Sequence, residues 1–278
     1  MKVLKKDERI TAESILLKHL PKSFQVYGLL YAYNRNKPSC IQVIVDTWPD
    51  FKVIICRPDP ENKQTSEWKN KIMFFSLDEQ MLRKMLSEED TIDWSTQFII
   101  GGYDSSYTSM LKEVSSQRMV NFKHRACAHL LYLPDSSHLI TQEFDSELKS
   151  RISPLQFSHA QLVNQTWKFG GDEKSYKKII SQINHFPSYC ITDGQGQPVS
   201  WLLLHEDHAM GMLYTLPEHR QKGYASVLIY TMAQRLLAEG YPLFCYVEEG
   251  NMTPYKLFKS MGFIEDPAYR AIWVAFNT

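Results

Sequence analysis

The sequence predicts a mixed α/β (α+β) fold in two successive units, and three observations lead to this. Hydrophobic residues make up 44% of the chain and charged residues 22%, short apolar runs alternate with stretches of helical period, and a polar, turn-rich segment divides the two halves. The 278 residues are enough for two domains of ordinary size. We expect an amino-terminal domain at residues 1–145 and a carboxy-terminal domain at residues 146–278.

The amino-terminal half shows a complete succession of strands and helices. Residues 10–20 have apolar side chains at helical spacing, with Thr11 as the candidate N-cap and Pro21 ending the helix. Apolar runs bounded by turn residues predict strands at residues 24–33, 41–45, 51–56, 72–75, 96–100 and 128–133. Two further helices are expected at residues 77–86 and 107–118.

The carboxy-terminal half follows a connecting segment at residues 134–150. Strands are expected at residues 151–157, 188–192, 199–206, 210–216, 244–247 and 270–276. Helices are expected at residues 160–167, 174–184, 224–239 and 253–261. The helix at 224–239 is the strongest, because one face is apolar; this face carries Ala225, Leu228, Ile229, Met232 and Leu236.

Charge and hydropathy argue against several classes of partner. Lys plus Arg and Asp plus Glu both number 31, so the net charge is zero, unlike most proteins that bind nucleic acid or membrane surfaces. No apolar stretch approaches the ~20 residues that span a bilayer. The first ten residues lack the apolar core of a secretory signal, and Asp7 and Glu8 are unusual in a mitochondrial presequence.

The five cysteines predict neither a disulfide framework nor a zinc site. They are odd in number, far apart in the sequence and contain no C-x-x-C pair. We expect reduced thiols, no metal site and no tightly bound cofactor.

The segment at residues 210–225 contains the most informative motif. A strand runs into a basic loop with the pattern R-x-x-G-x-A, and the loop runs into the strong helix; it comprises Arg220, Gln221, Lys222, Gly223, Tyr224 and Ala225. Free backbone N–H groups at a helix N-terminus attract anions, and a glycine lets the ligand approach the backbone closely. A pyrophosphate suits such a site. Taken alone, however, a glycine between basic residues is more often an ordinary strand–turn–helix.

The motif resembles the pyrophosphate loop of the GCN5-related N-acetyltransferase superfamily, and Asn251 with Met261-Gly262-Phe263 resembles that superfamily's second signature. Leu20 to Pro58, His159 to Glu173 and Tyr214 to Tyr224 resemble the glycine N-acyltransferase family, so the likeness covers nearly the whole chain. This resemblance implies transfer of an acyl group from acyl-CoA to the amine of glycine or glutamine. It further implies a GCN5-related fold in the carboxy-terminal half, preceded by the family's own α/β domain.

The resemblance also implies roles for individual residues and a direct reaction in a ternary complex. A backbone N–H of the strand Leu213, Tyr214, Thr215 and Leu216 would polarise the thioester carbonyl. Residues expected to bind coenzyme A are these four, the six loop residues, Asn251 and Tyr255. The turn at residues 167–171 is expected to form the wall on the acceptor side, where its aromatic residues line the acyl pocket or belong to the core.

Two positions depart from the family pattern. The tyrosine often found seven residues after the motif asparagine, which would protonate the departing thiolate, is replaced by Phe258. Tyr255, one helical turn earlier, would substitute only if the helix is rotated or shifted, and is otherwise a packing residue. The family's glutamate base is replaced by Ala209, which leaves His208 and Glu206 as the nearest candidates, or a purely structural polar turn. A histidine suits the task because its ordinary pKa of about 6.5 lies near neutrality.

Two rival functions stay open at this point. One is an acyl-CoA-binding paralogue with weak catalysis, and the other is an acetyltransferase acting on a protein or polyamine amine. In either case, we expect a monomer with acyl-CoA and an amine as its partners, without nucleic acid or a membrane span. The resemblance implies a mitochondrial location, with the cytoplasm as the alternative.

Limited proteolysis tests the division into domains. Because exposed, turn-rich connections are cut before packed elements, we expect the first cleavage between Pro134 and Arg151. Mass spectrometry of the early fragments checks this expectation. Protection of the whole connection while cuts accumulate elsewhere would contradict it.

Overall fold

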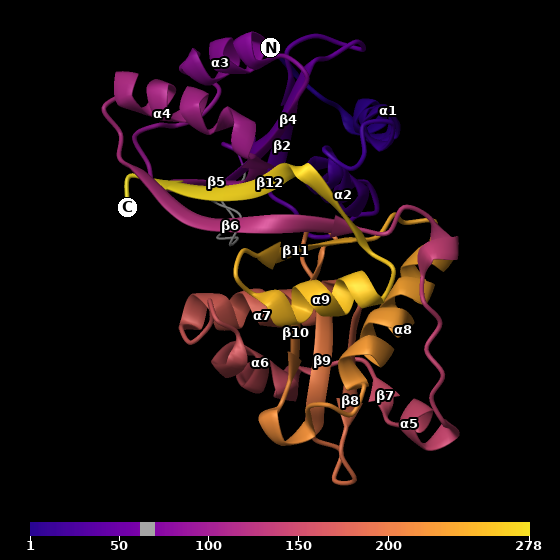
Figure 1. Cartoon of the computed structure of the whole chain (residues 1–278). Helices are drawn as coiled ribbons and strands as arrows, with labels where there is room; N and C mark the ends of the chain where they lie inside the picture. Colours follow the sequence, from indigo (N-terminus) through magenta and orange to yellow (C-terminus); the bar gives the residue numbers. More distant parts are fainter. Residues whose placement is uncertain (62–69) are drawn as a thin grey trace. The chain divides into compact units, whose positions relative to one another are not determined.

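A computed structural model describes residues 1–61 and 70–278 of the chain. It has a mixed α/β fold, as the sequence predicts, and divides into two compact units (Figure 1). Unit 1 comprises Met1–His129 together with Asp266–Thr278, and unit 2 comprises Leu130–Glu265. In the parts of the chain that the structure describes, no helix is both long enough and apolar enough to span a membrane.

Unit 1 is built on a sheet with the strand order β1-β2-β3-β4-β5-β12-β6. Strands β2 to β4 pair antiparallel, β4 and β5 pair parallel, and β12 lies antiparallel to β5. The elements are β1 (Lys2–Val3), α1 (Lys6–Leu17), α2 (Phe24–Asn34), β2 (Ile41–Val45), β3 (Val53–Pro58), β4 (Lys71–Ser76), α3 (Glu79–Ser87), β5 (Phe98–Asp104), α4 (Thr108–Gln117), β6 (Phe122–Tyr132) and β12 (Ile264–Phe276).

The last strand explains why the compact units differ from the domains expected at 1–145 and 146–278. Strand β12 returns to unit 1, where Phe276 stacks on Phe98 at a ring-centroid distance of 4.7 Å and meets Trp94 edge-on. Ile272 and Val274 from the same strand belong to the same apolar core. The chain therefore completes its first core with its final residues, which no local sequence pattern indicates.

Two expectations for the first 34 residues were wrong. Residues 24–33 form helix α2 rather than a strand, because a helix buried on all sides shows neither the 3.6-residue period nor strand alternation. Every residue from Phe24 to Ala32 is buried. Helix α1 begins at Lys6, after Lys5 as its N-cap, and so Thr11 lies inside the helix.

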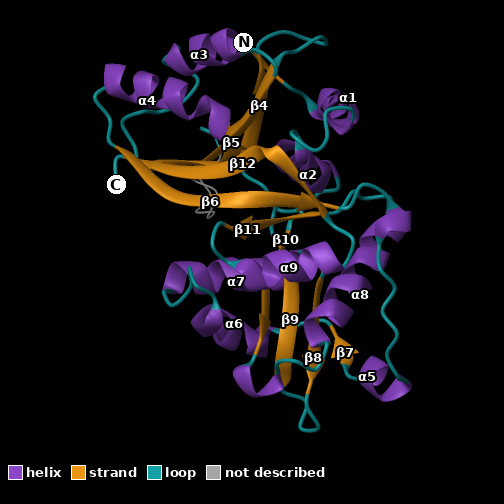
Figure 2. Cartoon of the chain, viewed as in Figure 1, coloured by secondary structure: helices purple, strands orange, loops and turns teal. Residues whose placement is uncertain are grey.

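Unit 2 is built on a sheet with the strand order β11-β10-β9-β8-β7 (Figure 2). Strands β7 to β10 pair antiparallel with their neighbours, and β10 pairs parallel with β11. The elements are α5 (Ser146–Ser150), β7 (Ile152–Ser153), α6 (Ala160–Thr166), α7 (Glu173–His185), β8 (Ser188–Thr192), β9 (Pro198–Leu204), β10 (Met210–Thr215), α8 (Tyr224–Ala238), β11 (Phe244–Glu248) and α9 (Met252–Ser260). The strand expected at residues 151–157 is thus only two residues long.

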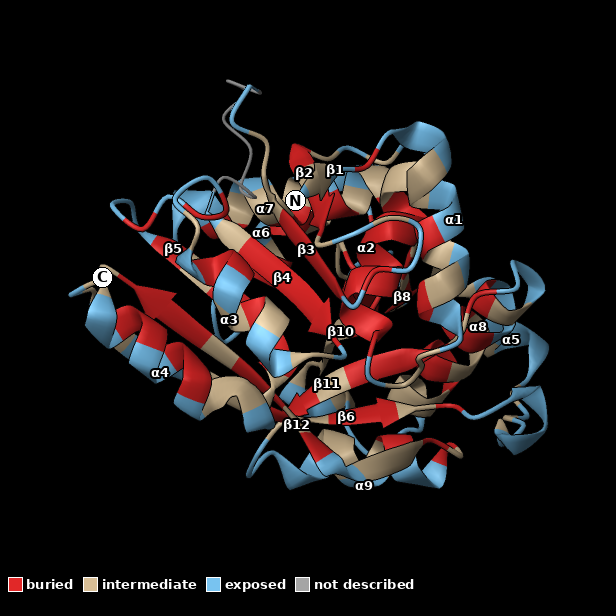
Figure 3. Cartoon of the chain, turned by 90° about the horizontal axis from the view of Figure 1, so that it is seen from above, coloured by how far each residue is buried: buried red, intermediate tan, exposed pale blue. Residues whose placement is uncertain are grey.

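Burial along the elements follows the predicted apolar face of α8 (Figure 3). Leu228, Ile229, Met232 and Leu236 are fully buried against β8, β9 and β10, whereas Ala225 at the start of the helix is half-buried. All seven residues of β9 are buried. This packing fixes the N-terminus of α8 at the end of the sheet.

Gly262 belongs to the second sequence signature, and the structure gives it a structural role within unit 2. Its φ of +97° is left-handed, and a Cβ there would overlap the backbone carbonyl of His138. The Ile140 N–H donates to the Met261 carbonyl, at 3.1 Å. The residue after Met261 must therefore be small for the 136–140 segment to pack against the end of α9.

We expect Gly262→Ala to destabilise the protein by more than the 1–3 kcal/mol that a left-handed backbone alone costs. The matched control is Gly196→Ala, because Gly196 has a φ of +78° with nothing within 4 Å of its Cβ position. Urea unfolding of the two variants measures the difference. Equal losses of unfolding free energy would show that the close approach to His138 contributes nothing.

Candidate functional site

Strands β10 and β11 diverge, and the site lies where they separate. Their register contains one pair, Met210 with Cys245. Beyond it the ladder between β9 and β10 is interrupted by a β-bulge, in which two residues of β10, Met212 and Leu213, oppose Leu202. Within the bulge, Met212 adopts a left-handed backbone conformation, with a φ of +52°.

One cavity, of about 690 Å³, lies against the basic loop and the N-terminus of α8. Gly223 is the N-cap in a left-handed conformation, with a φ of +75°, and no side chain caps the helix. The Arg220 Nε donates to the Thr215 carbonyl at 3.1 Å, and the Lys222 ammonium lies 3.5 Å from His219. The expected binding residues that line this cavity are Leu213, Tyr214, Thr215, Arg220, Gln221, Lys222, Gly223, Tyr224, Ala225 and Asn251.

A second cavity, of about 340 Å³, lies on the other side of the bulge. It is bounded by β9, β10, β11 and the turn after α6, and it contains Trp167, Phe169 and the buried Phe258. Four residues line both cavities, so the two meet where the strands diverge; these are Leu213, Tyr214, Asn251 and Pro254. Tyr214 stacks on Trp201 at 5.4 Å, which stabilises the junction.

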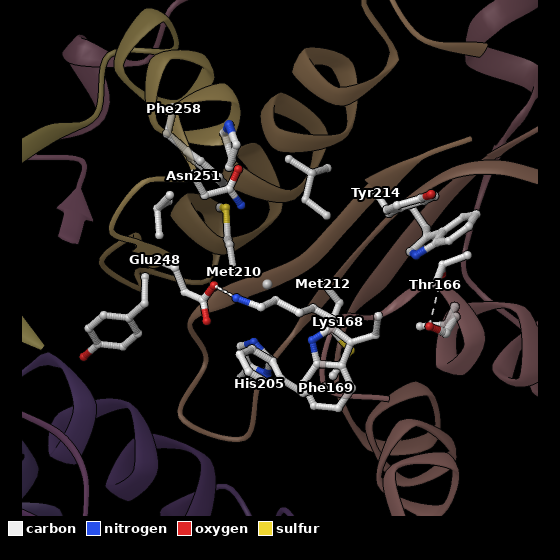
Figure 4. A pocket seen from close by; sticks show the side chains of 18 residues that line it. Thr166, Lys168, Phe169, His205, Met210, Met212, Tyr214, Glu248, Asn251 and Phe258 are labelled. Carbon is white, nitrogen blue, oxygen red and sulfur yellow. Dashed lines mark hydrogen bonds and ion pairs between the residues drawn. The ribbon is translucent and has the colours of Figure 1, made fainter. Parts of the chain in front are cut away.

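An ion pair lies across the second cavity (Figure 4). The Lys168 ammonium is 2.5 Å from the Glu248 carboxylate, and the two side chains are 71% and 27% exposed. Lys168 is the one Lys or Arg among the described residues around this cavity. Trp167 and Phe169 meet edge-on beside it, at 5.7 Å. Among the described residues, no three His, Cys, Asp or Glu side chains gather to hold a metal ion.

The two candidate bases from the sequence lie away from both cavities. The hairpin between β9 and β10 closes with His208 in a left-handed conformation, with a φ of +60°, and this directs its ring between Phe186 and Tyr241. His208 is 3% exposed. Glu206 forms an ion pair with Lys178 of α7 at 3.5 Å. Neither residue is placed to take a proton from a ligand in the cavity.

Two further residues from the sequence expectation lie elsewhere. The Tyr255 hydroxyl donates to Glu265, at 2.6 Å, and Tyr255 lines neither cavity. Leu216 packs on the core of unit 2, and its N–H donates to the Val199 carbonyl. The bond to Glu265 holds the Tyr255 hydroxyl, and Leu216 packs against the core instead of a cavity.

Sequence reasoning missed His205, which lines the second cavity. A Cβ on Gly211 would overlap the ring of His205, so the imidazole occupies the space that a side chain at position 211 would fill. The signal was present in the sequence as strand alternation, because Trp201, Leu203 and His205 share one face. His205 lies four residues before position 209, outside the run of polar residues next to it at positions 206–208.

Comparison with known proteins agrees with this architecture. Residues 1–187 match the family described as aralkyl acyl-CoA:amino acid N-acyltransferase, and residues 190–274 match the FR47-like family. A glycine N-acyltransferase from Bos taurus is 30% identical over 276 residues, with 92% of each chain covered.

Two solved structures show the same fold. A Drosophila protein superposes with a TM-score of 0.77 at 17% identity, covering 100% of this chain and 98% of its own. A GCN5-related N-acetyltransferase from Kribbella flavida gives a TM-score of 0.51 at 13% identity, covering 91% and 93%. The match over 187 of the 278 residues shows that the chain belongs to the aralkyl acyl-CoA:amino acid N-acyltransferase family.

Proposed function

We propose that this protein transfers an acyl group from acyl-CoA to the amino group of a small amino acid such as glycine or glutamine. One observation carries the proposal: two cavities, one at an uncapped helix N-terminus and one between diverging strands, share Leu213, Tyr214, Asn251 and Pro254. A donor that binds in the first cavity and an acceptor that binds in the second would meet at these residues.

The first cavity suits the pyrophosphate of coenzyme A. The N–H groups of the first turn of α8 have no side-chain cap, so a phosphate would satisfy them and interact favourably with the helix dipole. Arg220 and Lys222 add two cations at the same loop. Gly223 is left-handed and has no Cβ, so no side chain keeps the ligand away from the backbone at this position.

The bulge in β10 supplies the polarising group for the thioester. Because Met212 and Leu213 together oppose one residue of β9, the ladder cannot pair all of their backbone groups. A backbone N–H from this bulge, at the junction of the cavities, is the oxyanion donor that we assign. Removing one such donor in other enzymes costs roughly 10²–10³ in rate.

The second cavity suits an acceptor that carries a carboxylate. Lys168 provides the positive charge, and Glu248 holds its ammonium in place until the substrate arrives. The aromatic wall of Trp167 and Phe169 and the modest volume favour a small amino acid over a protein side chain.

Direct attack of the amine is the chemistry that this site favours. None of the five cysteines lines either cavity, and Cys245, which follows Phe244 in β11, is buried, which raises the pKa of its thiol well above the ordinary value. A thiol that stays protonated is a poor nucleophile. An acyl-cysteine intermediate is therefore no part of the proposal.

An acceptor panel in a coenzyme A release assay tests the function. With several acyl-CoA donors, we expect release with glycine or glutamine, little with glycinamide and none with spermidine or a lysine peptide. Release with the peptide or polyamine alone would favour the rival acetyltransferase. Acyl-CoA binding without release for any amine would favour a catalytically weak paralogue.

Lys168→Met should raise the KM for the amino acid about 10-fold or more, because hydrogen bonds to charged groups contribute about 1.5–3 kcal/mol. The KM for acyl-CoA should stay unchanged. Lys177→Met is the matched control, since Lys177 pairs with Glu173 on the exposed face of α7. Steady-state kinetics measure both constants; equal KM values in the two variants would remove Lys168 from the acceptor site.

Gly223→Val should weaken coenzyme A binding roughly 10- to 100-fold, because each lost phosphate contact costs about 1.5–3 kcal/mol. The control is Gly240→Val at the other end of α8, where φ is +71° and the Cβ position is equally open. Both variants strain the backbone alike, so calorimetry isolates the loss of ligand. Wild-type affinity in a folded Gly223→Val protein would place the pyrophosphate elsewhere.

A further inference from the structure

We infer that His205 is the general base of the proposed transfer and replaces, from the neighbouring strand, the glutamate that the family places at position 209. The inference rests on the proposed function. Three observations support it: the His205 ring lines the second cavity, His205 lies opposite Ala209 in the hairpin, and the ring contacts the buried Gln182.

His205 lies directly across the hairpin from Ala209. Its backbone N–H donates to the Ala209 carbonyl at 2.8 Å, and the pairs Leu204 with Met210 and Leu203 with Gly211 follow in register. Residues opposite each other in an antiparallel pair have Cβ atoms about 4.5–5.5 Å apart on the same face. A side chain at either position therefore projects toward the same space.

The two positions are nevertheless not equivalent in this chain. Ala209 is fully buried, whereas His205 is partly exposed and lines the cavity. Its ring extends along the sheet over Gly211, and the atom nearest to the Cβ position of that glycine is Nε2. The absence of a side chain at Gly211 is what allows the imidazole to reach the cavity.

The other ring nitrogen contacts Gln182 of α7. The Nδ1 atom lies 3.3 Å from the Gln182 amide nitrogen, and this side chain is 1% exposed. The Gln182 amide oxygen has no hydrogen-bond partner among the described residues. The donor and acceptor roles in this contact depend on the tautomer of the ring. In the amide orientation that points the oxygen at the ring, Gln182 would accept a hydrogen bond from Nδ1–H. Nε2 then carries the lone pair on the cavity side.

The charged and titratable groups around the ring leave His205 the best-suited base. On its own hairpin, Glu206 pairs with Lys178 of α7, Asp207 accepts the Ala209 N–H, and His208 packs on aromatic rings. Across the cavity stand Lys168 and Glu248, paired with each other, and the phenols Tyr214 and Tyr246. An ion-paired carboxylate is a weak base near neutral pH, while an imidazole is well matched to it.

The proton balance of the step is complete. The amino acid arrives as an ammonium, and Nε2 takes one of its protons and later releases it to solvent. The nitrogen lone pair forms the C–N bond with the thioester carbon. When the C–S bond breaks, its electron pair leaves with the sulfur, which takes a second proton from the nitrogen. The products are the N-acyl amino acid, still carrying one N–H, and coenzyme A thiol.

The test compares His205→Asn with His138→Asn, a matched change at an exposed histidine paired with Asp135. At pH 7 we expect His205→Asn to lower kcat with glycine by about 10²–10⁴-fold, the usual contribution of a general base. Coenzyme A affinity should be unchanged, and the loss should shrink as the pH rises and more of the amine is neutral. His138→Asn should behave as the wild type.

Two further variants separate a catalytic role from a structural one. His205→Ala opens a space above Gly211, so added imidazole should restore part of the lost rate in that variant and have no effect on the wild type. Gln182→Leu removes the positioning residue. Because the lost acceptor no longer stabilises the protonated ring, the pH profile of kcat should shift to lower pH without a matching change in the KM for acyl-CoA.

The outcomes are distinguishable from failure of the function itself. A folded His205→Asn protein with the rate and pH profile of the wild type would overturn the role of His205 while leaving the transfer intact. A large loss in Glu248→Gln, without one in His205→Asn, would assign the base to Glu248. If the wild type acylates no amine while still binding acyl-CoA, the proposed function fails, and the role of His205 fails with it.

Discussion

The divergence of β10 and β11 is the constraint on which the site depends. Inside a continuous sheet, the backbone groups of Met212 and Leu213 would be paired and covered by neighbouring side chains. The bulge and the left-handed Met212 end the parallel pairing after Met210. The bulge lies beside Leu213 and Tyr214, which line both cavities. In the proposed reaction, a backbone N–H of this bulge donates to the thioester oxygen.

Helix α8 provides the second half of this arrangement, and its packing explains why it can remain uncapped. Its buried face against β8, β9 and β10 stabilises the helix without help from its first turn. The N-terminus is therefore available to an anion, and the left-handed Gly223 sets the angle at which the loop meets the helix. Core packing at Leu228 and Met232 thus indirectly fixes the position of this N-terminus.

The sequence was sufficient for the parts of the molecule that depend on local chemistry. The R-x-x-G-x-A loop, the apolar face of α8 and most strands of unit 2 follow from residue spacing, and the structure places ten of the expected binding residues around one cavity. It was insufficient where tertiary contacts decide. Helix α2 is buried on every side, β12 pairs with a strand more than 150 residues earlier, and His205 faces the cavity only because Gly211 leaves room.

The role proposed for His205 has a physical basis in the hairpin that joins β9 and β10. An antiparallel hairpin presents two side chains to one space, so a base can come from either strand while the acceptor keeps its position. His205 lies one residue beyond the end of β9, and its ring fills the space that Gly211 leaves open. Ala209 and Gly211 together clear that face of β10. The small residues at positions 209 and 211 and the ring of His205 therefore form one arrangement on this face of the hairpin.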